Sequence, residues 1–208
     1  MTIVANEVME DETMTETQKT GIVKLIPKKG DLRLLANWIP ISLLCVDNKA
    51  IAKVIATRLK PLLNKMIVKE QTGGMQDRDV ADNLSRFRNV IESHAEATGK
   101  LVKGKGGAAI VSLDFEKAFD RLDRTFLYEL MKKQGFSKKL LDMIKTLYEG
   151  NISKIVTNGK AITDVKLGRG VRQGRPLAMY LYIIFINPLL ERLRSCMVGV
   201  NVGGKTIK

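Results

Sequence analysis

The most constraining feature of this sequence is a largely apolar run, residues 108–113, that ends on the carboxylate of Asp114. A run of this kind is typical of a strand buried on both faces. A second carboxylate, Asp120, follows within VSLDFEKAFDRL. Six residues turn a helix by about 600° and extend a strand by about 20 Å, so the two carboxylates form no local pair. We expect Asp114 at the end of a strand and Asp120 in the turn or helix after it.

A carboxylate at a strand end suits Mg²⁺, a hard cation that prefers oxygen ligands. Two-metal phosphoryl chemistry needs several carboxylates around ions about 4 Å apart. The acids downstream of Asp120 are not adjacent to one another, and none follows Glu191. From the residues alone, two interpretations of Asp114 stay open: a metal ligand, or a solvated carboxylate that ends a strand.

Charge is unevenly distributed along the 208 residues. The net charge is +13 at pH 7, yet the first 18 residues contain five acids and no lysine or arginine. A basic body suits a polyanion such as nucleic acid, and a generally basic protein is the alternative. Aromatic residues make up only 5% of the chain, so charge rather than base stacking would dominate binding.

The composition is that of a globular protein, with 45% hydrophobic and 27% charged residues. No segment approaches the ~18 uninterrupted apolar residues of a membrane span, so we expect no membrane partner. The N-terminus lacks the pattern of a signal peptide. Cys45 and Cys196 are far apart and have no partners at metal-ligand spacing, which favours a reduced, intracellular protein.

Interleaved strand and helix patterns predict an α+β fold. After a polar, acidic lead-in, GIVKLIP indicates a strand, and helical spacing predicts a long helix from Ile41 to Met66, broken or bent at Pro61. A helix over 80–97 should bury Leu84, Phe87, Val90 and Ile91. Further helices are expected at 124–134, 138–148 and 177–194, with Ser137 as a cap and a hairpin turning at Asn158-Gly159.

Five segments occur in the order found in non-LTR retrotransposon (LINE-type) reverse transcriptases. They are GIVKLIPKKGD, NWIPISLLCVDNKAIAKVIATRL, QTGGMQDRDVADNL, VSLDFEKAFDRL and GRGVRQGRPLAMYLYIIFINPLLERL. The chain resembles that family over residues 18–208. The resemblance implies a partial right-hand polymerase: an acidic lead-in at 1–19, fingers at 20–107, and an incomplete palm at 108–208 that ends before the F/Y-A-D-D strand.

The resemblance also implies roles for the aspartate motif. Asp114 would be the catalytic carboxylate that coordinates both Mg²⁺ ions, with Mn²⁺ a possible substitute, and the backbone carbonyl of Phe115 would assist. Phe119 would be the steric gate that rejects a ribose 2′-hydroxyl, since a bulky ring there excludes the added oxygen. Without the motif, ordinary core packing is the alternative interpretation of Phe119.

Nucleotide and nucleic-acid contacts are implied elsewhere. Gln173 would border the incoming nucleotide, and Gly174 would allow close approach of the templating pair to the backbone. Arg172 is a candidate nucleic-acid contact, with a solvated basic loop as the alternative. Four finger lysines, as cations that neutralise phosphate charge, complete the set: Lys24 and Lys49 for the nucleotide, and Lys28 and Lys29 for nucleic acid.

The chain departs from the family pattern at several positions. Ile39 replaces the arginine of W-R-P, Gly74 replaces the aromatic of Q-x-G-F, and Arg175 stands where R-Q-G-C-P has a small thiol. The F/Y-A-D-D element is absent from the 208 residues. Gln71, Arg78, Asp82 and Asn83 match the family's second finger motif, and we expect their role to be mostly structural.

The implied function is RNA-directed DNA synthesis, with an RNA template, a DNA primer and dNTPs as partners. Without the paired aspartates we expect this 208-residue polypeptide to be inactive. The alternative is a non-catalytic, basic RNA- or DNA-binding remnant of a decayed retroelement, which Ile39 and Arg175 favour. An unstable fragment with an open palm edge is a third interpretation. Cytoplasm and nucleus are the expected locations; the host, template specificity and oligomeric state stay open.

Overall fold

The computed structural model describes residues 2–98, 110–157, 159–202 and 205–207. The chain forms two compact units. The first comprises residues 1–59 and 117–185, and the second comprises residues 60–116 and 186–208.

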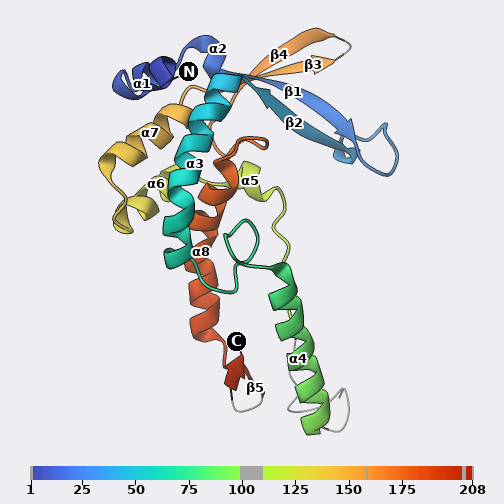
Figure 1. Cartoon of the computed structure of the whole chain (residues 1–208). Helices are drawn as coiled ribbons and strands as arrows, with labels where there is room; N and C mark the ends of the chain where they lie inside the picture. Colours follow the sequence, from blue (N-terminus) through green and yellow to red (C-terminus); the bar gives the residue numbers. More distant parts are fainter. Residues whose placement is uncertain (1, 99–109, 158, 203–204, 208) are drawn as a thin grey trace. The chain divides into compact units, whose positions relative to one another are not determined.

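A four-stranded mixed sheet forms the first unit's β layer (Figure 1). Its order is β2-β1-β3-β4, with β1 parallel to β3 and the other neighbours antiparallel. The strands are β1 (Thr20–Pro27), β2 (Trp38–Leu44), β3 (Ile152–Thr157) and β4 (Lys160–Lys166). The expected hairpin is confirmed by the pairing of β3 with β4; Asn158, in its expected turn, lies outside the described residues. A short 3₁₀ helix, η1 (Leu35–Asn37), lies in the connection before β2.

The predicted helix from Ile41 was wrong at its start. Residues 41–44 belong to β2, and the helix α3 begins after them (Val46–Met66). Strand β2 pairs with β1 along its whole length, from Gly21 opposite Leu44 to Pro27 opposite Trp38. This pairing satisfies the backbone N–H and C=O groups of residues 41–44 through a strand that is distant in the chain. A local helical pattern cannot reveal such a partner. Helix α3 also continues through Pro61 without a break.

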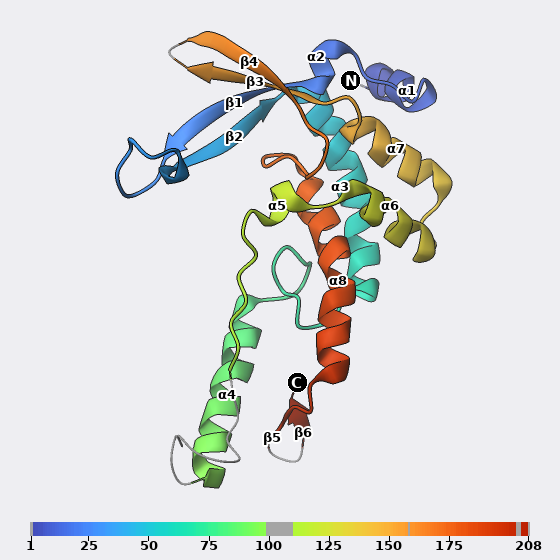
Figure 2. The same ribbon diagram turned by 180° about the vertical axis from the view of Figure 1, so that it is seen from behind.

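Helices enclose the core of the first unit. They are α1 (Thr2–Glu10), α2 (Glu16–Lys19), the first part of α3, α5 (Ala118–Arg121), α6 (Arg124–Lys133), α7 (Lys138–Tyr148) and the first part of α8 (Ala178–Cys196). Helices α6 and α7 lie side by side in Figures 1 and 2. The predicted cap is confirmed, since the Ser137 hydroxyl accepts from the Leu140 amide. Buried core residues include Ile55, Leu59, Leu127, Met131, Ile144, Leu147, Leu177, Leu181 and Ile184.

The acidic lead-in is part of the folded unit. Val8 and Met14 are buried, and the Thr146 hydroxyl of α7 donates to the Glu12 carbonyl at 3.2 Å. The side-chain amide of Asn48, on α3, donates to the Gln18 carbonyl at 3.0 Å. These contacts hold the lead-in against α7 and α3. Within the described residues, no helix is long and apolar enough to cross a membrane.

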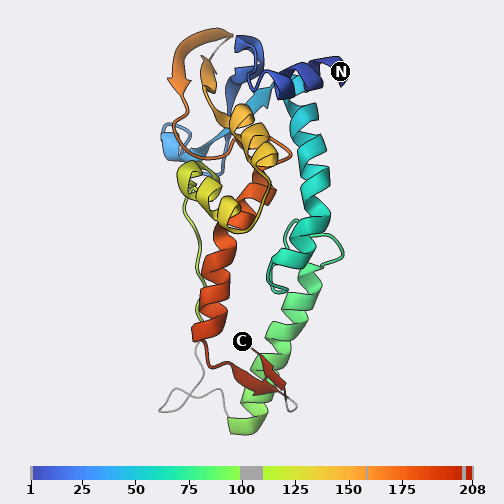
Figure 3. The same ribbon diagram turned by 90° about the vertical axis from the view of Figure 1, so that its left-hand side faces the viewer.

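The second unit contains α4 (Val80–Thr98) and a small hairpin of β5 (Val200–Val202) and β6 (Lys205–Ile207). Figure 3 shows α4 beside the hairpin. The prediction that α4 buries Leu84 and Phe87 was wrong, because these side chains are 63% and 48% exposed, whereas Val90 and Ile91 on the same predicted face are half-buried. The helix itself was predicted correctly, but its predicted buried face is covered only in part by the described residues.

The predicted strand ahead of Asp114 does not form in the part of the chain that the structure describes. Residues 110–115 have no regular secondary structure, and Ile110, Val111 and Leu113 are exposed. Residues 108–109 lie outside the described ranges. A strand requires hydrogen bonds to a neighbour, and no described strand pairs with this segment. The apolar pattern alone was therefore insufficient.

Candidate functional site

Helix α5, which carries Phe119, is fixed against the loop that precedes the R-Q-G segment. The Val171 amide donates to the Phe119 carbonyl and the Gly170 amide to the Leu122 carbonyl, both at 2.8 Å. Gly170 has a φ of +78°, and a Cβ there would lie 2.7 Å from the backbone oxygen of Asp120. Only glycine allows this approach. Two motifs about 50 residues apart in the chain are therefore joined backbone to backbone.

The Phe119 side chain is half-buried against helix α8. Its ring stacks on Tyr182, with centroids 5.1 Å apart and planes inclined by 27°. Tyr182 in turn stacks on Phe185 at 6.4 Å. The ring orientation is thus set by aromatic packing. Packing and a role as sugar gate are compatible, because part of the ring remains exposed.

Gln173 and Gly174 form a turn beside β2. Gln173 is half-buried and Gly174 is exposed. Gly174 has a φ of +93°, and a Cβ built on it would lie 3.2 Å from the Ser42 carbonyl oxygen. Gly174 thus lies close to the protein's own strand, while the approach of the templating pair stays a prediction.

Arg172 is a buried residue that connects strands. Its guanidinium donates to the carbonyls of Lys19 at 3.1 Å and Ile152 at 2.6 Å, next to β1 and at the start of β3. Burial, reinforced by Arg175, lowers the pKa of Arg172 to about 10. Its nucleic-acid contact stays a prediction; in this structure both Nη atoms are engaged with backbone carbonyls.

Arg175 and Arg124 meet at the carboxyl end of α7. Arg175 is 3% exposed; it donates to the Leu147 carbonyl at 2.6 Å and lies 4.4 Å from the ring centroid of Tyr148. Arg124 donates to the carbonyls of Tyr148 and Leu167. Burial lowers the pKa of Arg175 and raises that of Tyr148. The sequence showed Arg175 only as a departure from the family's R-Q-G-C-P pattern. It gave no sign of the role of Arg124, because no motif distinguishes this residue from a surface arginine.

The four predicted finger lysines belong to the first unit. Lys24 is exposed on β1 opposite Ile41, and Lys28 and Lys29 are exposed in the turn after β1. Lys49 is half-buried on α3. Their exposure is compatible with anionic ligands, but their individual roles stay predictions.

Asp114 and Phe115 belong to the second unit. Both are exposed, in the irregular segment that follows residue 109. Across the described ranges, no group of three or more histidine, cysteine, aspartate or glutamate side chains is placed to hold a metal ion. With one carboxylate and one backbone carbonyl from the protein, water and substrate phosphates would have to supply most of the oxygen ligands of a divalent cation. The described residues therefore do not complete a divalent-metal site.

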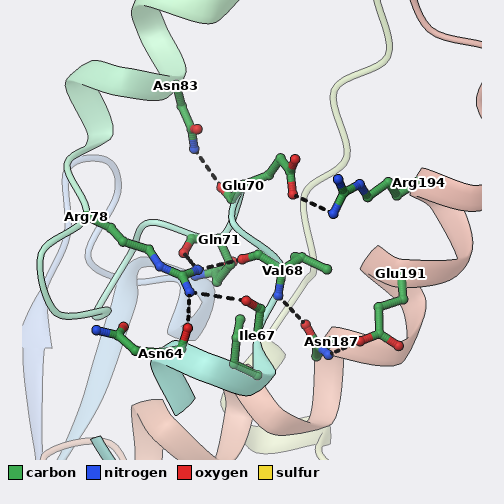
Figure 4. A network of polar contacts seen from close by, with 10 residues as sticks. All are labelled: Asn64, Ile67, Val68, Glu70, Gln71, Arg78, Asn83, Asn187, Glu191 and Arg194. Carbon is green, nitrogen blue, oxygen red and sulfur yellow. Dashed lines mark hydrogen bonds and ion pairs between the residues drawn. The ribbon is translucent and has the colours of Figure 1, made fainter. Parts of the chain in front are cut away.

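Arg78 organises the end of α3 in the second unit (Figure 4). Its guanidinium donates to the carbonyls of Asn64, Ile67, Val68 and Gln71. These oxygens lie at and just beyond the last turn of α3, where carbonyls lack helical partners and a cation is favoured. The expected structural role of Arg78 is confirmed.

Further polar contacts connect the segment after α3 to α8 and α4 (Figure 4). The buried Asn187 accepts from the Val68 amide at 3.1 Å and donates to Glu191 at 2.7 Å. Arg194 lies 3.8 Å from Glu70, and the Asn83 side chain donates to the Glu70 carbonyl at 2.7 Å. The finger motif that contains Gln71, Arg78 and Asn83 is thus a hydrogen-bonded structural element.

A family model described as reverse transcriptase (RNA-dependent DNA polymerase) matches residues 26–205. The chain is 37% identical over 182 residues to the Transposon TX1 uncharacterized 149 kDa protein of Xenopus laevis, covering 88% of this chain and 13% of that protein. It is 28% identical over 178 residues to the retrovirus-related Pol polyprotein from the type-2 retrotransposable element R2DM of Drosophila melanogaster, covering 86% and 16%. A probable RNA-directed DNA polymerase from transposon X-element, also of Drosophila melanogaster, is 26% identical over 188 residues, covering 89% and 20%.

The chain belongs to the reverse transcriptase family. Its resemblance to the enzymes of non-LTR retrotransposons is confirmed by the relatives with which it aligns. The mixed α/β architecture fits a polymerase domain of this family, whose members use divalent metal ions. The aligned region spans 13% to 20% of the length of these three relatives.

Proposed function

We propose that the chain carries the fingers, at residues 20–107, and the first part of the palm, at residues 108–208, of a retrotransposon enzyme that copies RNA into DNA. The observation that best supports this is the union of α5 with the loop before Arg172. It places the aromatic of the aspartate motif and the R-Q-G segment in one hydrogen-bonded structure. An RNA template, a DNA primer and dNTPs are the proposed partners.

Each predicted residue has a proposed task in that enzyme. Asp114 and the Phe115 carbonyl would supply oxygen ligands, and Phe119 would face the sugar of the incoming nucleotide. Gln173 and Gly174 would border the base pair that forms. The cations would contact phosphates: Lys24 and Lys49 on the nucleotide, and Lys28, Lys29 and Arg172 on the nucleic acid.

The proposed metal is Mg²⁺, with Mn²⁺ as a substitute, and it belongs to the complete enzyme. Bound there, a metal ion would stabilise charge on the reacting phosphate oxygens. The described residues provide too few ligands to hold it, and the 208 residues contain no F/Y-A-D-D element. We therefore propose that this polypeptide by itself does not extend primers.

Primer extension tests that proposal directly. The polypeptide is incubated with a DNA primer annealed to an RNA template, dNTPs, and Mg²⁺ or Mn²⁺. No extension is expected from the wild type or from Asp114→Asn. Incorporation by the wild type that Asp114→Asn abolishes would show that the chain holds a working site after all.

Binding without synthesis is the second candidate function, favoured by the incomplete metal site together with the net charge of +13. Filter binding of an RNA–DNA hybrid across a salt series measures it. Affinity should fall steeply with salt, because each phosphate contact releases counterions. Binding that is absent or insensitive to salt would count against both functions.

A charge-matched pair of variants tests where the nucleic acid binds. Lys28→Glu/Lys29→Glu should lower the salt slope by about 1–2, the contribution of one or two phosphate contacts. Lys138→Glu/Lys139→Glu changes the net charge equally at the exposed start of α7, where acids are tolerated. Equal losses from both variants would mean that charge acts without a defined finger contact.

A further inference from the structure

Two arginine side chains of the first unit, Arg175 and Arg124, meet at the carboxyl end of α7, and a third, Arg172, binds the Lys19 and Ile152 carbonyls. Arg175 donates to the Leu147 carbonyl and Arg124 to the Tyr148 carbonyl. Arg172 is influenced electrostatically by both of the other arginines. The hydrogen bonds of these guanidinium groups run to backbone carbonyl oxygens. A buried cation without a carboxylate partner is costly unless other groups compensate.

The end of α7 supplies part of that compensation; within the described residues, Nε and Nη2 of Arg175 are buried without a hydrogen-bond partner. The last carbonyls of a helix lack intrahelical partners, and the helix dipole places partial negative charge there. Arg175 satisfies the Leu147 oxygen at 2.6 Å, and its guanidinium lies 4.4 Å from the Tyr148 ring centroid, within cation–π range. Arg175, which interrupts R-Q-G-C-P, thus has two specific side-chain contacts: one hydrogen bond and one aromatic ring.

The backbone of Arg175 ends the turn that contains the proposed nucleotide contacts. The Arg175 amide donates to the Arg172 carbonyl at 3.3 Å, and the Ala178 amide donates to the Arg175 carbonyl at 3.1 Å. Between Arg172 and Arg175 lie Gln173 and Gly174. An anchored Arg175 side chain therefore restricts the turn at its downstream end, while Arg172 restricts it at the upstream end.

We propose that Arg175 is a positioning residue that fixes the Gln173–Gly174 turn by anchoring it to the carboxyl end of α7. The inference rests on the proposed function, because it concerns how that turn meets a nucleotide. It also changes how the presence of Arg175 in place of the family's cysteine is interpreted. A bulky cation in place of a small thiol is here an integrated anchor and no longer counts as a sign of decay.

Amide hydrogen exchange on the full chain tests the anchor. The Gly170, Val171 and Ala178 amides are the probes, because these residues are the same in every variant. In Arg175→Met their exchange should accelerate about tenfold, the effect of losing a hydrogen bond from a charged group, while the core of α3 keeps its protection. Arg175→Lys retains a cation and should be intermediate. Arg169→Met, at an exposed position in the preceding loop, should change nothing.

Two results would overturn the anchor. In the first, the probe amides of Arg175→Met exchange at the wild-type rate and the variant is at least as stable as the wild type. That result is expected if the buried charge is only tolerated, because an apolar side chain can then replace it without loss. The other is equal acceleration throughout the first unit, which would indicate global destabilisation. If Arg175→Met does not fold, the comparison of Arg175→Lys with Arg169→Met decides by the same criteria.

Nucleotide binding separates this inference from the proposed function. A fluorescent dNTP is titrated into the complex of the chain with primer and RNA template. Positioning predicts affinity in the order wild type, Arg175→Lys, Arg175→Met, with Arg169→Met equal to wild type. If the wild type does not bind the probe, the proposed nucleotide role fails, and the exchange result alone decides whether Arg175 anchors the turn.

Discussion

The carbonyl oxygen of Phe119 accepts a hydrogen bond from the amide of Val171 at 2.8 Å. This one bond connects the aromatic of the aspartate motif to the segment that leads into Gln173. Any shift of the 168–171 loop would consequently move α5. The positions that permit the contact are therefore sensitive sites for mutation.

Gly170→Ala should destabilise the first unit strongly. Its φ of +78° costs an alanine about 1–2 kcal/mol, and the added Cβ would lie 2.7 Å from the Asp120 oxygen. The overlap with backbone should add about 1–3 kcal/mol to the loss in unfolding free energy, measured by urea denaturation. Gly135→Ala isolates the conformational part, since Gly135 has a φ of +84° and open space around its Cβ position. Equal losses from both variants would contradict the steric argument.

Gly21→Ala should displace the guanidinium of Arg172. A Cβ on Gly21 would lie 2.9 Å from Nη1 of Arg172 and 3.0 Å from the Leu44 side chain. We expect a loss of about 1–3 kcal/mol in unfolding free energy, the usual cost of overpacking. Gly168→Ala, with nothing within 4 Å of its Cβ position, is the matched control and should change stability little. A neutral Gly21→Ala would mean that Arg172 relocates without cost.

Arg78→Met should destabilise the second unit by about 3 kcal/mol, because hydrogen bonds from a charged donor contribute about 1.5–3 kcal/mol and are not additive. The carbonyls at the end of α3 would lose their partner. Faster amide exchange near the end of α3 would locate the effect. Arg86→Met, at an exposed position of α4, removes the same charge and should be close to neutral. A loss no larger than that of Arg86→Met would refute the capping role.

Tyr128→Phe should alter the alkaline pH dependence of stability. Burial raises the pKa of Tyr128 to about 12 from a usual value near 10. Between those values the unfolded chain has lost the phenolic proton and the folded chain retains it, so the unfolding free energy falls as pH rises. The variant lacks this contribution and should lose stability less steeply from about pH 10 to 12, measured by urea denaturation at each pH. An identical slope would show that Tyr128 ionises normally.

The same variant makes a prediction at neutral pH. Within the described part of the chain, the Tyr128 hydroxyl is buried without a hydrogen-bond partner. Removing an unsatisfied buried hydroxyl should leave stability unchanged or raise it by about 1 kcal/mol. Pronounced destabilisation would indicate that the hydroxyl is satisfied in solution.

Local signals in the sequence were sufficient for several elements. The Ser137 cap, the helices α6 to α8 and the hairpin of β3 and β4 were predicted close to their observed positions. Each depends on residues within a few positions of one another, such as a hydroxyl beside free amides. The family resemblance likewise came from ordered short motifs, and the matching family model confirmed it.

Elements that depend on distant partners were predicted less well. Residues 41–44 have helical spacing, but β1 recruits them into β2. The apolar segment before Asp114 has the pattern of a buried strand, yet no described strand pairs with it. Leu84 and Phe87 have the spacing of a buried face and are exposed. In all three cases the structure depended on whether a distant segment packs or pairs with the element, and the local pattern does not contain that information.

The sequence by itself determined the family and the residues that carry its motifs, because motif order and spacing are properties of the chain. Only the tertiary structure decided what those residues contact. It buried Arg172 and Arg175 among backbone carbonyls, joined Phe119 to Val171, and left Asp114 exposed. The reason is physical, because burial and hydrogen bonding depend on which segments meet in space. The sequence shows an arginine in the same way whether its side chain is buried or solvated.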